Sequence, residues 1–203
     1  MPCLILDTST DLSIVALANE NGITSHEVFK HANLLSKNLL PAAQALLQKN
    51  GLAPSDLTSI AVGIGPGSYT GTRLGVAVAK SLAFALNVPI KAFCSPLAFI
   101  PDNQGTFAFI IPARSGNYFL VKGMLDTDYT HFSSAGLIPP EKLAAEIGDA
   151  GHLIFSACEN FPDALKEKPR LEPSLNLSVL WQFLLATEPT DPENMELHYL
   201  HTP

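Results

Sequence analysis

The stretch AVGIGPGSYTGTRLG at residues 61–75 determines how the rest of this chain can be organised. An apolar run at residues 59–64 leads into it and is typical of a β-strand. The glycines and the proline that follow end the strand. Ser68 then stands where its hydroxyl can accept a hydrogen bond from a free N–H of a following helix. The stretch therefore predicts a strand, a glycine-rich turn and a helix that runs from Tyr69 to about Leu86.

The glycine-rich turn has two interpretations, and its residues leave both open. It can be a tight strand-to-helix reversal in which glycine allows positive φ and close backbone approach, or a phosphate cradle at a helix N-terminus. It is not a P-loop, because no Lys-Ser or Lys-Thr follows, and it is not GxGxxG, because a serine stands at the third glycine position. The residues of this signature loop are Gly63, Gly65, Pro66, Gly67, Ser68, Tyr69 and Thr70.

The string Gly-x-Gly-Pro-Gly-Ser-(Phe/Tyr)-Thr-Gly-x-Arg-x-Gly is more specific than a bare glycine pattern. It resembles the signature of the TsaB (YeaZ) family, whose members are non-catalytic partners in bacterial tRNA threonylcarbamoyladenosine synthesis. Ile64 departs from the family pattern, in which a polar residue is common at that position. The matching positions are Gly63, Gly65, Pro66, Gly67, Ser68, Tyr69, Thr70, Gly71, Arg73, Leu74 and Gly75.

Composition predicts a folded, cytoplasmic protein. The chain has 203 residues, of which 47% are hydrophobic, so it can bury a sizeable core. Its net charge of −7 repels phosphate backbones, so we expect the chain alone to bind tRNA poorly. Cys3, Cys94 and Cys158 are far apart and are expected to be free thiols in a reducing compartment. No signal peptide and no membrane span is predicted.

The first half is predicted to follow the order β-β-β-α-β-α-β. Three strands joined by short turns, one of them at Asn21-Gly22, predict an antiparallel meander. A helix is expected at residues 31–50 from its apolar spacing, with a kink or a break at Pro41. The predicted strands are residues 3–6, 13–18, 23–29, 59–64 and 89–93.

The element order and the resemblance together predict an actin-like ATPase (ribonuclease H-like) α/β fold. The expected domains are residues 1–100, which carry the signature loop and the interface helices, and residues 101–203, a smaller half of the same type. In the second half we expect strands at residues 106–111, 118–124 and 152–156 and helices at residues 140–147 and 173–187. The positions that depart from the family pattern in either half are Leu35, Ile64, Pro112 and His201.

The resemblance implies a vestigial phosphate loop at Asp7, Thr8, Ser9 and Thr10, where related kinases contact phosphates. It implies no metal site, because the catalytic paralogue TsaD holds its metal with two histidines four residues apart. Here His26 and His31 are five apart, and Leu35 stands where the family often has histidine. No nucleophile–base set can be argued from spacing either. We therefore expect no catalytic residue and no tightly bound cofactor, with ATP, ADP and metal belonging to partners.

Two stripes run along the helix after the signature loop. Gly71, Gly75, Ala79 and Ala83 make a smooth stripe, and Leu74, Val78, Leu82 and Leu86 make an apolar one. Both stripes can be buried inside one domain, or the smooth stripe can allow close approach of another helix. The resemblance favours the second alternative, since TsaB proteins pair through this helix and the preceding one. The expected interface residues are Leu35, Leu39, Gly71, Arg73, Leu74, Gly75, Val78, Ala79 and Leu82.

The resemblance implies a scaffold that binds and activates TsaD. With TsaE in a larger complex, the pair carries out threonylcarbamoylation of adenosine 37 in ANN-decoding tRNAs. The chain is expected to meet tRNA only through that complex and to form a homodimer as a further possibility. The alternative is an enzyme of the same superfamily, either a small-molecule kinase or ATPase or a metal-dependent peptidase of the glycoprotease-like M22 type.

Overall fold

The computed structural model describes most of the chain, and its elements fall into two compact units. The first unit combines Met1–Ser95 with Leu184–Tyr199, so a late segment of the chain returns to it. The second unit holds Pro96–Phe183. For residues 35, 36 and 130–135 only the backbone is described. The described residues are 1–10, 12–30, 35–100, 105–113, 116–126, 130–155, 165 and 170–199.

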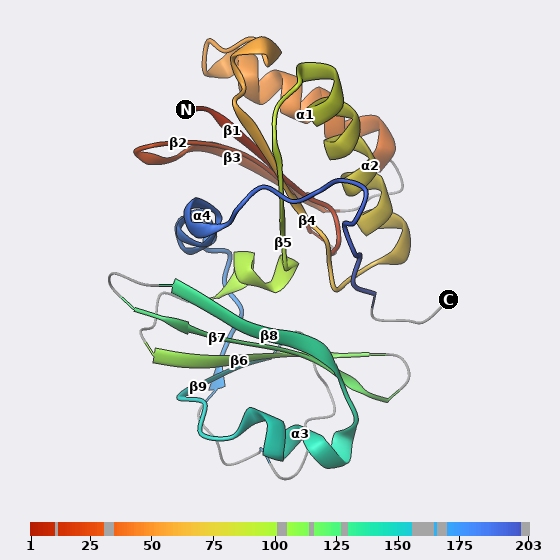
Figure 1. Ribbon diagram of the computed structural model, residues 1–203, viewed down its shortest axis with the longest axis vertical. Helices are drawn as coiled ribbons and strands as arrows, with labels where there is room; N and C mark the ends of the chain where they lie inside the picture. Colours follow the sequence, from red (N-terminus) through yellow and green to blue (C-terminus); the bar gives the residue numbers. More distant parts are fainter. Residues whose placement is uncertain are drawn as a thin grey trace. The chain divides into compact units, whose positions relative to one another are not determined.

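The first unit is built on a five-stranded mixed sheet of order β3-β2-β1-β4-β5 (Figure 1). β2 runs antiparallel to both β1 and β3, while β4 runs parallel to β1 and β5 runs parallel to β4. This confirms the predicted meander and the alternation of strand and helix after it. The strands are β1 Cys3–Asp7, β2 Leu12–Asn19, β3 Gly22–Lys30, β4 Ser59–Gly63 and β5 Ile90–Phe93.

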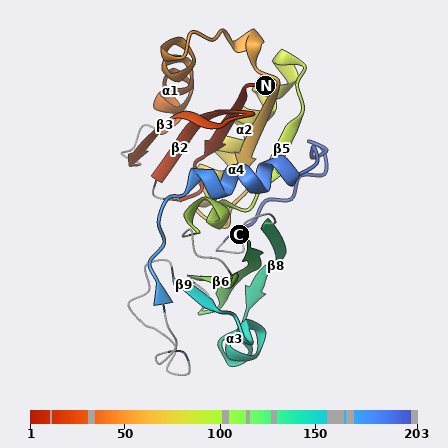
Figure 2. The same ribbon diagram turned by 90° about the vertical axis from the view of Figure 1, so that its left-hand side faces the viewer.

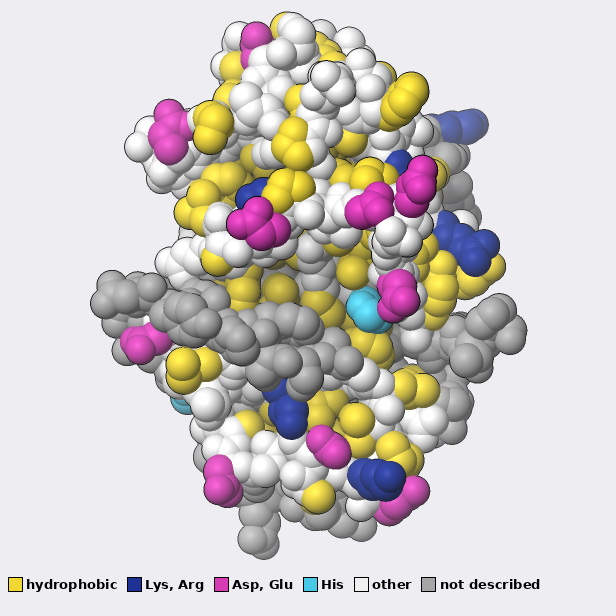
Figure 3. All heavy atoms as spheres, in the orientation of Figure 1, with side chains coloured by type: hydrophobic (Ala, Val, Ile, Leu, Met, Phe, Trp, Pro, Cys, Tyr) yellow, Lys and Arg dark blue, Asp and Glu magenta, His cyan; other side chains and the backbone are white. Residues whose placement is uncertain are grey.

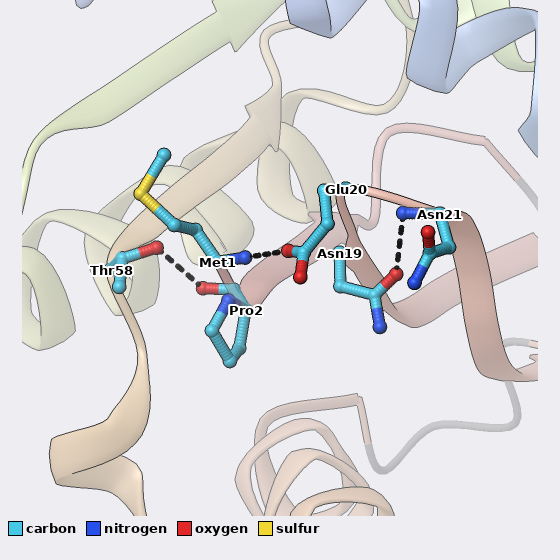
Figure 4. A network of polar contacts seen from close by, with 6 residues as sticks. All are labelled: Met1, Pro2, Asn19, Glu20, Asn21 and Thr58. Carbon is cyan, nitrogen blue, oxygen red and sulfur yellow. Dashed lines mark hydrogen bonds and ion pairs between the residues drawn. The ribbon is translucent and has the colours of Figure 1, made fainter.

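Polar contacts tie the start of β1 to its two neighbours (Figure 4). The amino group of Met1 pairs with the carboxylate of Glu20, in the turn between β2 and β3. The hydroxyl of Thr58, just before β4, donates to the carbonyl of Pro2 at 3.1 Å. These contacts hold the end of the sheet that lies away from the signature loop.

Two long helices, α1 Leu35–Lys49 and α2 Tyr69–Leu86, cover one face of this sheet (Figures 1 and 2). α1 continues through Pro41, so the predicted break is wrong. Pro41 is exposed, and water can satisfy the carbonyl that loses its N–H partner there. A short 3₁₀ turn, η1 Pro54–Asp56, follows α1. The core under the helices includes Leu4, Leu6, Val15, Leu17, Leu39, Leu46, Ile60, Val62, Val76 and Ala79.

The second unit repeats the plan with a sheet of order β10-β9-β6-β7-β8. β7 runs antiparallel to β6 and to β8, and β9 runs parallel to β6. α3, Pro140–Ile147, buries Leu143 and Ile147 in the core of this unit. Two sheets of this kind confirm the predicted actin-like α/β fold. The strands are β6 Gly105–Pro112, β7 Tyr118–Leu125, β8 Thr130–Ile138, β9 His152–Phe155 and β10 Arg170–Leu171.

Three elements of the later chain differ from the prediction. β8 and β10 were not predicted. α4, Leu177–Ala186, begins four residues later than expected, because Asn176 caps it by accepting the N–H of Val179 at 3.1 Å. A 3₁₀ turn, η2 Ser95–Phe99, follows β5.

Candidate functional site

The signature loop joins β4 to α2 in the first unit, as predicted. Gly65 has a φ of +91°, a conformation that favours glycine, and the bond from Gly65 to Pro66 is cis. Ser68 caps α2, since its hydroxyl accepts the N–H of Gly71 at 3.2 Å. The loop therefore turns the chain from strand to helix within a few residues.

The loop after β1 packs directly against the signature loop. Asp7, Thr8 and Ser9 are buried, and Thr10 is partly buried. A Cβ atom added to Gly67 would lie 1.9 Å from the carbonyl oxygen of Ser9. The glycines are needed because the chain's own backbone occupies the space that a side chain would fill.

Polar groups of the two loops bond to each other. The N–H of Ser68 donates to the carbonyl of Ser9 at 2.6 Å, and the hydroxyl of Thr8 donates to the carbonyl of Gly71 at 2.6 Å. The N–H of Ser9 donates to Asp7 Oδ1 at 2.8 Å. The Thr8 hydroxyl and the N–H groups of Ser9 and Ser68 are therefore engaged within the chain, and this geometry fits the interpretation of the loop as a structural turn.

The segment after β5 is hydrogen-bonded to the signature loop. The hydroxyl of Ser95 accepts the N–H of Gly65 at 3.0 Å, and the backbone N–H of Ser95 donates to the carbonyl of Gly65 at 2.8 Å. Burial raises the pKa of the neighbouring Cys94 thiol, and the charge of Asp7 raises it further. Burial also raises the pKa of Cys3. Both thiols are free and stay protonated at neutral pH, so neither is an activated nucleophile.

Residues 195–199, called here the C-terminal segment, lie along the signature loop. Met195 is 9% exposed in the core of the first unit. The N–H of His198 donates to the carbonyl of Ile64 at 2.8 Å, and Tyr199 forms a β-bridge with Gly67. The sequence did not predict this contact. The one sequence signal near it is Tyr199-Leu200, which resembles the Tyr-Leu of a Pro-x-Tyr-Leu-Arg motif near the C-terminus of TsaB proteins.

Tyr199 ends beside two residues of α2. The Nε of Arg73 donates to the Tyr199 hydroxyl at 3.0 Å. The guanidinium carbon of Arg73 lies 4.0 Å from the ring centroid of Tyr69, and the two tyrosine rings lie 5.0 Å apart. The C-terminal segment and the first turns of α2 thus form one cluster.

The smooth stripe of α2 does not lie on the surface, so the expectation that it receives another helix is wrong. Gly71, Gly75, Ala79 and Ala83 are all buried within the first unit. A Cβ atom on Gly75 would lie 2.4 Å from the hydroxyl of Thr8, which explains why small residues are needed there. Leu39 of α1, another expected interface residue, is also buried in the core.

A different stripe of α2 faces outward. Arg73, Ala77, Ser81 and Ala85, spaced four residues apart, are exposed. The expected interface residues Leu74, Val78 and Leu82 lie beside this stripe and are half-buried. Two further apolar side chains stand in solvent, Phe84 of α2 at 91% and Leu40 of α1 at 47% exposed.

A hollow of about 600 Å³ opens at the far end of α2. Lys80 and Phe84 of α2 are among the residues that line it, together with three prolines. The exposed Phe84 was not singled out by sequence reasoning, because a phenylalanine in an apolar helix is usually a core residue. The prolines are Pro89, Pro189 and Pro192.

Some residues considered in the sequence analysis form no metal site in the described part of the chain, and others lie outside the described residues. His26 is exposed on β3. Among the described residues, no three His, Cys, Asp or Glu side chains gather as metal ligands. Over the same residues, no helix has both the length and the apolar character needed to cross a membrane. Outside the described residues lie His31, Cys158, His201 and the side chain of Leu35.

Sequence comparisons identify known proteins that this chain resembles. Residues 17–136 match the profile of the family described as TsaD, tRNA N6-adenosine threonylcarbamoyltransferase. The tRNA threonylcarbamoyladenosine biosynthesis protein TsaB of Bacillus subtilis is 35% identical over 122 residues, which cover 59% of this chain and 53% of that protein. TsaB of Escherichia coli is 34% identical over 91 residues, 44% of this chain and 38% of that protein. The chain thus spans about half, or less, of the length of these curated relatives.

Solved structures extend the likeness over the whole chain. YeaZ from Pseudomonas aeruginosa superposes with a TM-score of 0.75 at 25% identity, covering 96% of this chain and 98% of that one. A second Pseudomonas aeruginosa structure, of a protein with similarity to the peptidase YEAZ, gives a TM-score of 0.76 at 25% identity, covering 98% and 99%. Because these two structures cover nearly the whole chain, the likeness in fold includes the second unit.

Proposed function

The chain belongs to the family typified by TsaD, and within it to the TsaB (YeaZ) group, and from this premise we propose that it acts in tRNA threonylcarbamoyladenosine biosynthesis as a non-catalytic partner of a TsaD protein. In this proposal TsaE joins the pair in a larger complex, and the chain contacts tRNA only through that complex. The modification reaction takes place in the cytoplasm. The observation that carries the proposal is the likeness to proteins named TsaB, together with a family match over residues 17–136 that includes the signature loop and α2.

The outward stripe of α2 supports a role in pairing. Ala77, Ser81 and Ala85 are exposed and small, so the backbone of another helix can approach closely there. The half-buried Leu74 and Val78 border the stripe and add apolar surface. We propose this face, rather than the buried smooth stripe, as the surface that meets TsaD or a second copy of the chain.

The packing of the two loops supports a non-catalytic role. The carbonyl of Ser9 fills the space beside Gly67, and the Ser9 N–H is engaged with Asp7. The resemblance implies that related kinases contact phosphates at the loop after β1, whereas here that loop contacts the signature loop. A partner of this kind acts by binding one conformation of TsaD better than another.

A reconstituted reaction tests the proposal. Purified TsaD, with the threonylcarbamoyl donor and tRNA, should turn over little alone and repeatedly when this protein is added. Ala77→Trp, which places a bulky ring on the exposed stripe, should abolish the stimulation. Lys49→Ala, at the exposed end of α1, should leave it intact and serves as the surface control.

Polar variants separate the scaffold from an enzyme. Ser9→Ala and His26→Ala should stimulate TsaD nearly as well as the unchanged protein, because neither side chain is assigned any chemistry. If one of them stopped turnover while the complex still formed, this chain would supply a reacting group. The scaffold proposal would then fail in favour of the enzyme alternative.

A further inference from the structure

Arg73 is exposed, yet its orientation is fixed on two sides. Its guanidinium stacks on the ring of Tyr69 at 4.0 Å and its Nε donates to the hydroxyl of Tyr199 at 3.0 Å. A long cationic side chain normally loses conformational freedom when it binds a partner. For Arg73 the stacking and the hydrogen bond have already removed much of that freedom.

Tyr199 is itself held by backbone contacts. His198, the residue before it, donates its N–H to Ile64, and Tyr199 bridges to Gly67. A Cβ atom on Gly65 would lie 2.2 Å from the carbonyl oxygen of His198, so the segment and the loop are in close contact. The tyrosine hydroxyl is therefore presented to Arg73 by the fold of the first unit.

The charge of Arg73 has no partner within the part of the chain that the structure describes. No carboxylate lies within 4.0 Å of it there, although the chain has 19 acidic residues against 12 basic ones. The side-chain hydrogen bond that it makes uses Nε, which leaves the paired Nη groups for a planar oxyanion. Carboxylate and phosphate both fit such a fork.

A protein carboxylate fits this place better than a nucleic acid. The net charge of −7 opposes a polyphosphate, with its many charges, more strongly than a single carboxylate within a protein interface. Figure 3 shows Lys and Arg side chains scattered over the face that it draws, without a basic patch among the coloured residues. Arginine and tyrosine, together with tryptophan, are also enriched among the residues that contribute most to binding at protein interfaces.

We propose that Arg73, held by Tyr69 and Tyr199, receives an aspartate or glutamate side chain of the TsaD partner; this inference rests on the proposed function. Arg73 stands in line with Ala77, Ser81 and Ala85 on the exposed stripe, so the anchor is continuous with the proposed pairing face. Tyr199 acts as a positioning residue, because it orients the arginine without meeting the partner's carboxylate.

Affinity measurements with purified TsaD test the anchor. Arg73→Ala should weaken binding by about 10- to 100-fold, the usual effect of losing a hydrogen bond to a charged group. Arg73→Lys should recover only part of the loss, because lysine lacks the planar fork. Tyr199→Phe removes the orienting hydroxyl and should weaken binding several-fold. Lys80→Ala, on the same helix but away from the tyrosines, should bind as the unchanged protein does.

Charge reversal distinguishes an anchor from a structural effect. Arg73→Glu should lose binding, and one Asp→Arg or Glu→Arg change on the surface of TsaD should restore it. Misfolding of the variant cannot produce such a rescue. If no acidic position of TsaD restores binding, or if Arg73→Ala binds TsaD as well as the unchanged protein, the anchor is wrong while the proposed function stands.

Two further outcomes overturn the inference. If the unchanged protein fails to bind TsaD, both the proposed function and the anchor fall together. If Arg73→Ala weakens binding of tRNA, measured by fluorescence anisotropy, and leaves TsaD binding intact, the cluster is a phosphate contact instead.

Discussion

Gly67 shows how a single residue decides the geometry of this site. Its missing side chain leaves room for the carbonyl of Ser9, and that carbonyl accepts the N–H of Ser68 at the start of α2. The strand-end loop and the helix can meet only because nothing stands between them. The requirement is local and steric, so it can be tested by adding one carbon atom.

Gly67→Ala should therefore destabilise the protein severely. The new Cβ atom would lie 1.9 Å from a backbone oxygen, which cannot move without breaking its hydrogen bond. The expected loss is about 3 kcal/mol in the free energy of unfolding, measured by urea denaturation. Gly136→Ala is the matched control, since its Cβ atom meets nothing within 4 Å, and it should stay within about 0.5 kcal/mol. Equal stability of the two variants would contradict the close approach.

His198 makes the C-terminal segment sensitive to pH. Burial lowers its pKa in the folded protein, and Glu196 opposes this in part. The unfolded or released segment therefore takes up a proton first as the pH falls through about 6.5, the ordinary histidine value. Stability of the docked segment is full above that value and declines below it.

Hydrogen exchange of the His198 amide, which is bonded to Ile64, measures this docking. Relative to the intrinsic exchange rate, protection should fall as the pH is lowered below about 6.5, the ordinary histidine pKa. His198→Gln, which does not titrate, should show a flatter profile. Protection that is unchanged over this range in the unaltered protein would show that His198 does not control the segment.

α2 has one face that packs into the core of the first unit and one face that is exposed to solvent. The buried face carries Gly75 and Ala79 against the chain's own core, and the exposed face carries Ala77 and Ser81. Both faces carry small side chains, so hydropathy alone does not show which face is buried. The contact with Thr8 identifies which of them is internal.

Two tryptophan substitutions separate these faces. Ala79→Trp places a large ring where no solvent reaches, so it should cost about 3 kcal/mol or more and lower the melting temperature. Ala77→Trp, two residues away on the exposed face, should change stability by about 0.5 kcal/mol or less. Thermal denaturation of the two proteins gives the comparison. Equal melting temperatures would mean that the faces are assigned wrongly.

The sequence predicted the elements that carry strong local signals. The cap at Ser68 and the glycine-rich turn located α2 within the chain, and hydrophobic spacing located α1. β8 was missed because THFSSAGLI lacks a regular alternation of apolar and polar residues. The contact of Tyr199 with Arg73 spans 126 residues, and no local pattern encodes such a distance.

At the scale of the whole molecule, the loop after β1 and the signature loop pack against each other and leave little room between them. Asp7 and Thr8 are buried against the signature loop, and the chain carries a net negative charge. Both features oppose the binding of a free polyphosphate. The isolated protein is therefore expected to need no nucleotide of its own.

Calorimetry with ATP and magnesium should reveal no tight site on the isolated protein. A micromolar dissociation constant, about −8 kcal/mol, would contradict this expectation and revive the kinase alternative. In that case Asp7→Ala should remove the binding if the vestigial phosphate loop holds the nucleotide. A melting curve of the variant would show that the fold survives.

The return of Leu184–Tyr199 to the first unit has a consequence for synthesis on the ribosome. The sheet of that unit and the helices α1 and α2 are complete when Ser95 has been made, but the segment that covers the signature loop follows roughly a hundred residues later. At ordinary elongation rates this delay lasts on the order of 5 to 20 s. During that time Ile64 and Gly67 of the nascent chain lack the C-terminal segment that covers them. The first unit is therefore synthesised first, yet it cannot finish folding until the second unit has also been synthesised.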